Sequence, residues 1–237
     1  MAEGGIEGSR ILVTGAGLVG SRLVRSLAAN GAKEIRVIDA SAERLRSLGE
    51  WAEPLAGDIT DPELAARAAA DADLVFHTAA ILEGNDVAAY HRVNLTGTEV
   101  IATAAARSGA VRRFVQLSSV AVYGYAHGDI TEEHPIAPKP EAYSRSKAAG
   151  EAAAFRIGAA AGMPVSAVRP AGVFGPGSRY FSGTFMKRAM KRPIRMVGNG
   201  RGSQPVIFVD DLVDMLLTLG THPAAAGQVF NCAIDPS

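Results

Sequence analysis

The residues best suited to proton chemistry in this sequence are a tyrosine and a lysine four positions apart. Tyr143 and Lys147 lie in the segment Tyr-Ser-Arg-Ser-Lys, which opens an alanine-rich stretch of helical character. Positions i and i+4 of a helix share one face, so the ammonium group comes near the phenol. A neighbouring positive charge lowers a tyrosine pKa, and such a tyrosine can exchange a proton with a hydroxyl or carbonyl group. The same spacing on its own also occurs on solvated helix faces.

A glycine-rich segment near the N-terminus predicts a dinucleotide-binding site. It reads Ile-Leu-Val-Thr-Gly-Ala-Gly-Leu-Val-Gly, which places the pattern G-x-G-x-x-G between an apolar strand and a helix. Gly15 allows a sharp turn, Gly17 lets the backbone approach a pyrophosphate, and Gly20 lets the helix pack on the strand. The phosphates are expected at the helix N-terminus, around Leu18 and Val19, where the dipole favours negative charge. A tight turn without a ligand is the alternative interpretation.

Two carboxylates are candidates for the adenosine half of such a ligand. Asp39 ends the second apolar run, about 20 residues beyond the glycine motif, where a carboxylate binds the ribose hydroxyls. Because a carboxylate repels the additional phosphate of NADP, NAD is the predicted cofactor. The alternative is that Asp39 only caps the helix that begins near Ser41. Asp58, followed by Ile59, is predicted to lie beside the adenine, or else to be a turn residue.

These residues require a sheet whose strands end at one edge, and the sequence predicts one. Short β-branched runs alternate with alanine-rich segments, which is typical of a parallel sheet covered on both faces. We expect strands over residues 11–13, 35–38, 54–56, 74–76, 114–117, 165–168 and 229–232. We expect helices over residues 19–30, 62–70, 87–108, 141–161, 184–192 and 211–219. The predicted fold is α/β, a Rossmann-like doubly wound parallel sheet with ligands at the carboxyl ends of its strands.

The composition of the chain changes after residue 170. Residues 1–170 are predicted to form a dinucleotide-binding domain, and residues 171–237 a small substrate-binding region rich in glycine and proline loops. Within that region, residues 205–219 are expected to pack back on the main domain. The basic stretch of this region has two interpretations, substrate-phosphate binding or the solvated face of an amphipathic helix, and the second is favoured. Its basic residues are Lys187, Arg188, Lys191, Arg192 and Arg195, and the expected packed face holds Phe185, Met186 and Met190.

Composition excludes several classes of protein. The 237 residues include 48% hydrophobic residues, which excludes global disorder. The charges balance, with 24 basic and 24 acidic residues, so nothing favours nucleic acid or an anionic membrane as a partner. The single cysteine, Cys232, cannot form an intramolecular disulfide, which favours a reducing, cytoplasmic location. We see no secretory signal, no membrane-spanning stretch and no clustered metal ligands, so no metal site is predicted.

Taken together, these segments resemble the extended short-chain dehydrogenase/reductase family, in its NAD-dependent epimerase/dehydratase group. The resembling segments occur in the family's order and cover most of the chain: 14–20, 77–80, 93–94, 118–124, 143–147, 169–177 and 209–211. The resemblance implies NAD as the cofactor and hydride transfer between a substrate carbon and the nicotinamide. It also implies a homodimer formed through the helices around residues 87–108 and 141–161.

The resemblance further implies roles for single residues. Ser119 would hydrogen-bond the reacting oxygen, Tyr143 would be the general acid and base, and Lys147 would hold the nicotinamide ribose and tune the tyrosine. Further cofactor contacts are expected from Ala79, Ala80, Asn94, Ser118, Pro170 and Val173. Substrate contacts are expected from Ser119, Val120, Tyr143, Arg179 and Gln204. Without the resemblance, Asn94 is a local cap at a helix start, and His77 is a hydrogen-bonded structural residue.

Three departures from the family pattern concern the substrate. The spacing between Gly15 and Gly17 is one residue shorter than usual, and Gln204 occupies the position of an arginine that binds the diphosphate of nucleotide sugars. Arg179 and Arg201 are the candidates to substitute for that arginine. The chain also stops soon after residues 227–232, where extended members continue, so the substrate lobe is expected to be shortened. The leading interpretation is a nucleotide-sugar epimerase or dehydratase. The alternatives are a hydroxysteroid- or dihydroflavonol-type dehydrogenase and a non-catalytic NAD-binding regulatory protein.

Overall fold

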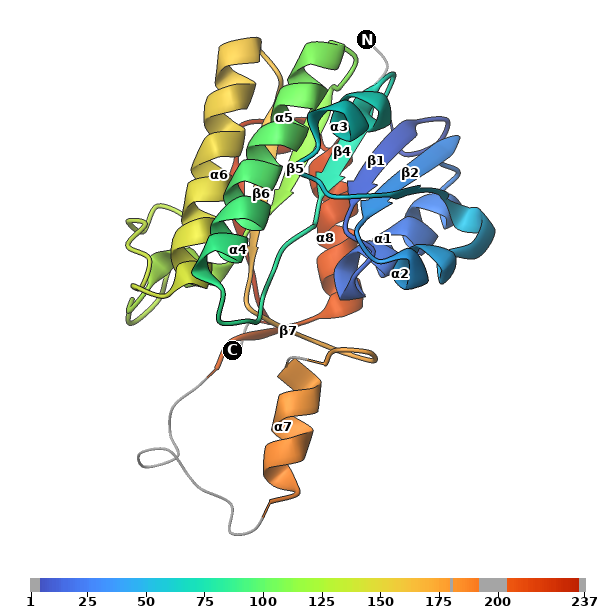
Figure 1. Cartoon of the computed structure of the whole chain (residues 1–237). Helices are drawn as coiled ribbons and strands as arrows, with labels where there is room; N and C mark the ends of the chain where they lie inside the picture. The colour runs from blue at the N-terminus through green and yellow to red at the C-terminus, as the bar shows by residue number, and fades with distance from the viewer. Residues whose placement is uncertain (1–4, 180, 192–203, 235–237) are drawn as a thin grey trace.

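The computed structural model describes residues 5–179, 181–191 and 204–234, which form a doubly wound α/β fold. Seven parallel strands make the central sheet in the order β3-β2-β1-β4-β5-β6-β9 (Figure 1). The order reverses direction next to β1, so this fold has its ligand crevice at the carboxyl ends of β1 and β4. The strands are β1 (Arg10–Thr14), β2 (Glu34–Asp39), β3 (Glu53–Ala56), β4 (Leu74–His77), β5 (Arg113–Leu117), β6 (Val165–Pro170) and β9 (Val229–Cys232).

Helices cover both faces of this sheet. One layer holds α3 (Pro62–Ala69), α5 (Gly97–Ser108) and α6 (Ala142–Ala161), and the other holds α1 (Leu18–Ala29) and α8 (Val209–Thr221), as Figure 1 shows. The shorter elements are α2 (Ala42–Arg46), α4 (Val87–His91), α7 (Phe181–Ala189), the 3₁₀ turns at Gly49–Trp51, Val120–Tyr123 and Pro223–Ala225, and the π-helical turn η2 (Arg92–Thr96).

The apolar character of the strands explains why helices cover both faces of the sheet. Successive residues of a strand point to opposite faces. Ile11 and Val13 therefore pack in the cluster with α1 and α8, while Leu12 between them packs in the cluster with α3 and α5. The same alternation buries Phe76 on the first side and Phe114 on the second. A strand that is buried on both sides must be almost continuously apolar, as these strands are.

The predicted doubly wound fold is confirmed, and the expected strands and most helices occur within a few residues of the predicted bounds. The predicted helix over 87–108 is in fact α4, the π-helical turn η2 and α5. The strands β7 (Gly172–Phe174) and β8 (Val206–Phe208) were not predicted, and they pair in parallel as a separate two-stranded sheet. Three residues are too few to show a periodicity, and the pairing of these strands depends on partners 34 residues away in the sequence.

The region after residue 170 is only partly separate from the main sheet. Leu212 and Leu216 of α8 are buried in the same cluster as α1, and β9 pairs with β6. Helix α7 instead projects from the body of the molecule (Figure 1). The expected packed face of this helix is therefore wrong for Met186 and Met190, which are 63% and 80% exposed. Arg192 and Arg195 lie outside the described residues, and the domain boundary at residue 170 stays a prediction.

Gly20 of α1 lies too close to the glycine turn for any side chain. A Cβ atom at residue 20 would lie 1.8 Å from the carbonyl oxygen of Gly15 and 2.9 Å from Thr78 Oγ1. We predict that Gly20→Ala lowers the free energy of unfolding by about 3 kcal/mol, since the backbone must move to relieve the clash. Gly17→Ala is the matched control, because φ is −75° there and a Cβ atom would have no neighbour within 4 Å. Urea unfolding measures both variants, and equal losses would contradict the prediction.

Candidate active site

A cavity of about 420 Å³ lies at the carboxyl edge of the sheet. Its walls come from the turn after β1, the ends of β2 and β3, the loop after β4, the end of β5 and helix α6. The predicted site residues on its wall are Gly15, Gly17, Leu18, Val19, Gly20, Asp39, Asp58, Ile59, Ala79, Ala80, Ser118, Tyr143, Lys147, Pro170 and Val173. The fold therefore brings most of the predicted cofactor residues together, although they are spread over nearly 160 positions of the sequence.

The glycine turn gives this cavity an end suited to anions. Gly15 has φ of +84°, and a Cβ atom there would lie 2.8 Å from the Cα atom of Ala79. Helix α1 begins at Leu18, after an N-cap at Gly17 that has no side-chain cap and open space beside it. The first N–H groups of a helix have no acceptor within it, and its dipole favours negative charge. The shorter glycine spacing thus still produces a helix N-terminus with open space beside it at this end of the cavity.

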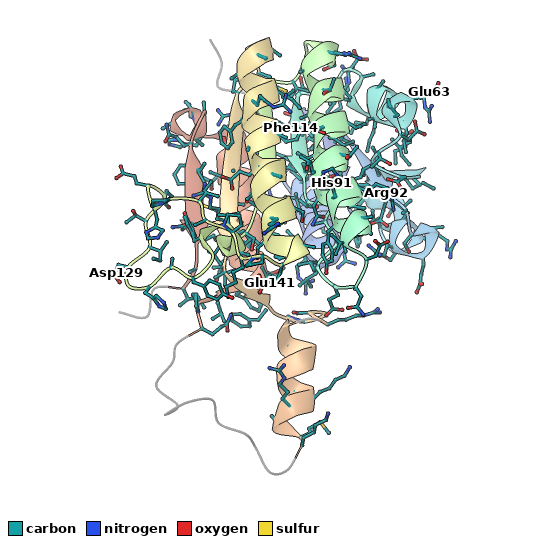
Figure 2. All side chains as sticks on the ribbon, turned by 60° about the vertical axis from the view of Figure 1, so that its left-hand side comes forward. Glu63, His91, Arg92, Phe114, Asp129 and Glu141 are labelled. Atoms are coloured by element: carbon teal, nitrogen blue, oxygen red, sulfur yellow. The ribbon has the colours of Figure 1, made fainter. Side chains whose placement is uncertain are left out.

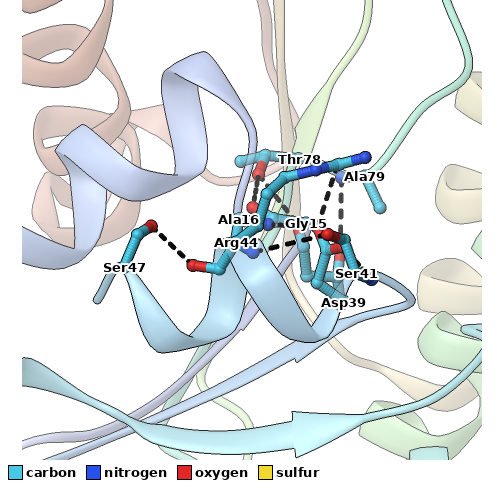
Figure 3. A network of polar contacts seen from close by, with 9 residues as sticks. Gly15, Ala16, Asp39, Ser41, Arg44, Ser47, Thr78 and Ala79 are labelled. Atoms are coloured by element: carbon cyan, nitrogen blue, oxygen red, sulfur yellow. Dashed lines mark hydrogen bonds and ion pairs between the residues drawn. The ribbon is translucent and has the colours of Figure 1, made fainter. Parts of the chain in front are cut away.

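Asp39 connects the glycine turn to the loop after β2 (Figure 3). Its buried carboxylate accepts hydrogen bonds from the N–H of Ala16 on Oδ2 and from the N–H of Ser41 on Oδ1, each 2.7 Å long. Arg44 Nη1 lies 3.2 Å from Oδ2. The cap of α2 is Ser41, whose Oγ accepts from the N–H of Arg44. A carboxylate oxygen accepts about two hydrogen bonds, so Oδ1 retains a position for a ribose hydroxyl.

Asp58 and Arg92 form an ion pair on the wall of the same cavity. Asp58 Oδ1 accepts hydrogen bonds from the N–H and the hydroxyl of Thr60, at 3.0 and 2.9 Å, and Oδ2 faces Arg92, which is labelled in Figure 2. Partial burial opposes ionisation, but the hydrogen bonds from Thr60 and the charge of Arg92 outweigh it and lower the pKa of Asp58. The carboxylate is therefore ionised at neutral pH. Sequence analysis did not identify Arg92, which comes from the π-helical turn η2.

Tyr143 and Lys147 both line the cavity from the first turns of α6. Lys147 is 4% exposed, and its Nζ donates to the carbonyl oxygen of Leu117 at 2.6 Å. Burial lowers the pKa of Lys147 to about 8, against the opposing effect of Glu151 one turn later. The ring of Tyr143 packs edge-on against Tyr90, with centroids 6.4 Å apart. This arrangement places a phenol and an amine of adjustable charge beside the predicted cofactor region.

A buried ion pair anchors α6 one turn beyond Lys147. Arg169 of β6 binds Glu151 through two hydrogen bonds, from Nε at 3.0 Å and from Nη2 at 2.5 Å. Arg169 Nη1 also donates to the hydroxyl of Tyr123 at 2.6 Å, and that hydroxyl donates to Asn231 Oδ1 at 2.8 Å. The chain of contacts links α6, β6, the turn Val120–Tyr123 and β9. The sequence signal for Glu151 is its i+4 spacing from Lys147, which sequence analysis did not use.

The two serines after β5 have different surroundings. Ser119 is buried and caps the turn Val120–Tyr123, accepting on Oγ from the N–H of Ala121 at 3.1 Å. This bond leaves its hydroxyl hydrogen able to donate, but Ser119 is absent from the wall of the cavity. Ser118 is on the wall, and its Oγ is buried without a hydrogen-bond partner among the described atoms. A buried hydroxyl in this state can be satisfied by a bound ligand.

Asn94 does not line the cavity, but its side chain is hydrogen-bonded to Ile81, which does. Its Oδ1 accepts from the N–H of Ile81 at 2.8 Å, and its Nδ2 donates to the carbonyl of Ile81 at 3.1 Å and to Ser146 Oγ at 3.0 Å. Asn94 lies within the π-helical turn η2, so the local-cap interpretation is wrong. Ile81 itself lines the cavity, as does its neighbour Leu82. Asn94 thus fixes the loop after β4.

His77 has a purely structural setting, as predicted. Its Nδ1 lies 2.7 Å from Thr14 Oγ1, and its Nε2 lies 2.9 Å from Thr98 Oγ1. The hydroxyl of Thr98 donates to the carbonyl of Asn94, so it must accept from Nε2–H, which assigns the proton to Nε2. Burial, followed by the charge of Lys147, lowers the pKa of His77 to about 3. The ring is therefore neutral at physiological pH.

Of the predicted substrate residues, Tyr143 lies on the cavity wall and the other four do not. Arg179 and Gln204 are exposed and, like the half-buried Val120, are absent from the cavity wall. Arg201 lies outside the described residues. Other wall residues were not predicted: Ile38, Ala40, Arg44, Gly57, Thr78, Ile81, Leu82, Arg92, Val93 and Leu117. Most are direct neighbours of predicted residues in sequence, and this adjacency is the signal that could have found them.

The described part of the chain has neither grouped metal ligands nor a helix suited to a membrane. Among the described residues, no three or more histidine, cysteine, aspartate or glutamate side chains are grouped so that they could hold a metal ion. In the described ranges, no helix has the length and apolar character needed to span a membrane. Cys232 is buried, and burial together with Asp211 raises the pKa of its thiol to about 11.

The parallel sheet, the glycine turn and the acidic residue at the end of β2 define a dinucleotide-binding α/β protein. A sequence profile of the NAD-dependent epimerase/dehydratase family matches residues 11–233, and this chain belongs to that family. The family resemblance seen in the sequence is therefore confirmed.

Known proteins similar to this chain differ in what they act on. It is 32% identical to a 3β-hydroxysteroid dehydrogenase/Δ5→4-isomerase of Mycobacterium tuberculosis, over 94% of this chain and 64% of that protein. It is also 32% identical to a UDP-glucose 4-epimerase of Mycolicibacterium smegmatis, over 94% of this chain and 76% of that protein. An uncharacterised Sinorhizobium fredii protein is 31% identical over 93% of this chain. The chain spans 66% of the length of that protein, slightly under two thirds.

Solved structures show the same fold. An epimerase from Methanothermobacter thermautotrophicus superposes with a TM-score of 0.84 at 30% identity, covering 96% of this chain and 72% of that one. A variant dTDP-glucose 4,6-dehydratase from Streptomyces venezuelae, crystallised with NAD, superposes with a TM-score of 0.81 at 26% identity. This second match covers 94% of this chain and 75% of the dehydratase.

Lys147 makes the stability of the fold pH-dependent in the alkaline range. Its pKa of about 8 in the folded chain lies below the ordinary 10.5, so between these values the unfolded chain binds more protons and stability rises with pH. We predict that the unfolding free energy of the wild type, minus that of Lys147→Met, increases by about 3 kcal/mol between pH 7 and pH 10.5. Urea unfolding at both pH values measures this difference. The prediction is wrong if this difference does not change with pH. It is also wrong if the corresponding difference for Lys33→Met, which replaces an exposed lysine, changes with pH by the same amount.

Proposed function

We propose that this chain binds NAD in the cavity and acts as an NAD-dependent oxidoreductase or epimerase on a secondary alcohol or ketone. The main observation behind this proposal is that Tyr143 and Lys147 line the same cavity as the glycine turn and Asp39. Bound NAD would supply the hydride chemistry. The protein then needs only to position the substrate carbon and to move one proton.

Tyr143 is the proposed general acid and base. Its phenol would take the proton of a substrate hydroxyl on oxidation and return it on reduction. The Lys147 ammonium stabilises the phenolate, and a pKa near 8 leaves this ammonium largely charged at neutral pH. The hydrogen bond from Lys147 to the carbonyl of Leu117 holds the amine in place. The hydroxyl of Ser119 would donate to the reacting oxygen.

The remaining cofactor contacts follow from the wall of the cavity. The N–H groups at the start of α1 would bind the diphosphate, Oδ1 of Asp39 a ribose hydroxyl, and Asp58 with Ile59 the adenine. The orphaned hydroxyl of Ser118 would face the nicotinamide half, together with Ala79, Ala80, Pro170 and Val173. A homodimer and a cytoplasmic location remain predictions.

Two substrate classes are compatible with this site. A nucleotide sugar is supported by the similarity to the epimerase of Mycolicibacterium smegmatis and to the Streptomyces venezuelae dehydratase. An apolar alcohol or ketone is supported by the mycobacterial hydroxysteroid dehydrogenase and by two features of the chain. Gln204 replaces a diphosphate-binding arginine, and Leu82 on the cavity wall is 54% exposed, so it offers an apolar contact.

Incubation of the protein with NAD and separate panels of UDP- and dTDP-sugars and of hydroxysteroids tests this proposal. Net formation of reduced nicotinamide identifies a dehydrogenase, and sugar isomerisation without net reduction identifies an epimerase. NAD binding without turnover on either panel supports the non-catalytic alternative. Isothermal titration calorimetry measures the binding.

Tyr143→Phe is expected to abolish turnover on the panel that proves active, because only the ionisable hydroxyl is lost. We expect a fall in kcat of at least about a hundredfold, the usual contribution of a general acid or base. The affinity for NAD should stay within about threefold of the wild type, or about 0.7 kcal/mol. Tyr90→Phe is the matched control, since that phenol packs against Tyr143. Unchanged kcat in Tyr143→Phe would remove the proposed acid and base.

Asp39→Asn is expected to shift selectivity toward NADP. The substitution removes the negative charge that repels the 2′-phosphate and releases Arg44 Nη1, now 3.2 Å from Oδ2, to bind it. We expect the ratio of the NADP to the NAD dissociation constant to fall by about tenfold, or about 1.4 kcal/mol. Fluorescence titration with the two reduced dinucleotides measures the ratio. An unchanged ratio would mean that Asp39 only braces the turn.

A further inference from the structure

We propose that Arg92 is an additional cofactor-binding residue, and that Arg92 and Asp58 together form a donor and acceptor pair that recognises the 6-position of the purine base. This inference rests on the proposed binding of NAD. Both side chains line the cavity, next to Gly57 and Ile59. They come from separate elements, Asp58 from the loop after β3 and Arg92 from the turn η2, and their side chains form an ion pair.

The hydrogen bonds of Asp58 determine where a base could bind. Its Oδ1 already accepts two hydrogen bonds from Thr60, one from the N–H and one from the hydroxyl. A carboxylate oxygen accepts about two, so Oδ1 is full. Oδ2 accepts only from Arg92 Nη1 among the described contacts. A 6-amino group that donates to Asp58 must therefore share Oδ2 with Arg92, which brings the guanidinium to the edge of the base.

The backbone that carries Arg92 is held firmly. Arg92 begins the π-helical turn η2, and Asn94 two residues later is fixed by hydrogen bonds to Ile81 and Ser146. The Arg92 side chain is itself 53% exposed, so its ion pair with Asp58 contributes little to the stability of the fold. Its position on the cavity wall gives it a larger effect on ligand binding than on folding.

The pair offers complementary groups to two kinds of purine. A 6-amino group, as in adenine, donates to Oδ2 of Asp58. A 6-oxo group, as in hypoxanthine, is repelled by that oxygen but can accept from Arg92, whose guanidinium has five N–H donors and uses one or two of them on Asp58. A lone aspartate has no donor to offer to a 6-oxo group. With Arg92 beside it, the site should accept both.

Binding of NAD and of nicotinamide hypoxanthine dinucleotide tests this inference without any knowledge of the substrate. We expect the wild type to bind the hypoxanthine dinucleotide within about tenfold of NAD, and Arg92→Met to raise the ratio of the two dissociation constants by a further factor of about ten. Asp58→Ala should lower the ratio, because NAD loses its acceptor. Isothermal titration calorimetry measures both dissociation constants for the wild type and for each variant.

Arg44→Met is the matched control, because Arg44 lines the same cavity beside Asp39 at the ribose position. It should change the two dissociation constants by the same factor. A ratio that is unchanged in Arg92→Met, or that moves equally in Arg44→Met, would overturn the inference while leaving the proposed function intact. Failure of the wild type to bind NAD would overturn both. Because the readout is a ratio, a general loss of stability in one variant does not imitate the expected result.

Discussion

The common direction of the seven strands is the constraint on which the rest of this molecule depends. Because every strand of the central sheet is parallel, each connection must cross a face of the sheet, and helices cover both faces. All carboxyl ends then meet at one edge, next to the point where strand order reverses. The glycine turn, Asp39, Asp58 and the loop after β4 reach one cavity for this reason alone.

Several polar groups are buried at that edge, and most of them are paired within the described residues. Thr14, His77, Thr98 and Asn94 form a continuous chain of hydrogen bonds beneath the cavity. Lys147 is held by the carbonyl of Leu117. A low-dielectric interior makes each unpaired polar group costly, so such chains lock their members in a single geometry. The neutral His77 and the lowered pKa of Lys147 are consequences of the same burial.

The ion pair of Glu151 and Arg169 extends this order one turn further along the same face of α6. Both groups are buried, and loss of one would leave the other as an uncompensated charge, which is far more costly than the pair itself. Through Tyr123 and Asn231 the pair also ties α6 to β9, the strand at the sheet edge. The helix that presents Tyr143 and Lys147 is thus positioned by residues far from it in sequence.

The sequence by itself determined the features that depend on neighbouring residues. Alternation of apolar runs with alanine-rich segments predicted the doubly wound sheet, the pattern from Gly15 to Gly20 predicted the turn into α1, and the spacing of Tyr143 and Lys147 predicted their common face. Such signals are local, because helix and strand periodicities repeat within a few residues. Only the tertiary structure decided that Arg92 meets Asp58, that Glu151 meets Arg169, and that Ser118 lies on the cavity wall while Ser119 caps a turn. These outcomes depend on side chains from separate elements competing for the same space and the same hydrogen bonds, and no periodicity along the chain records that competition.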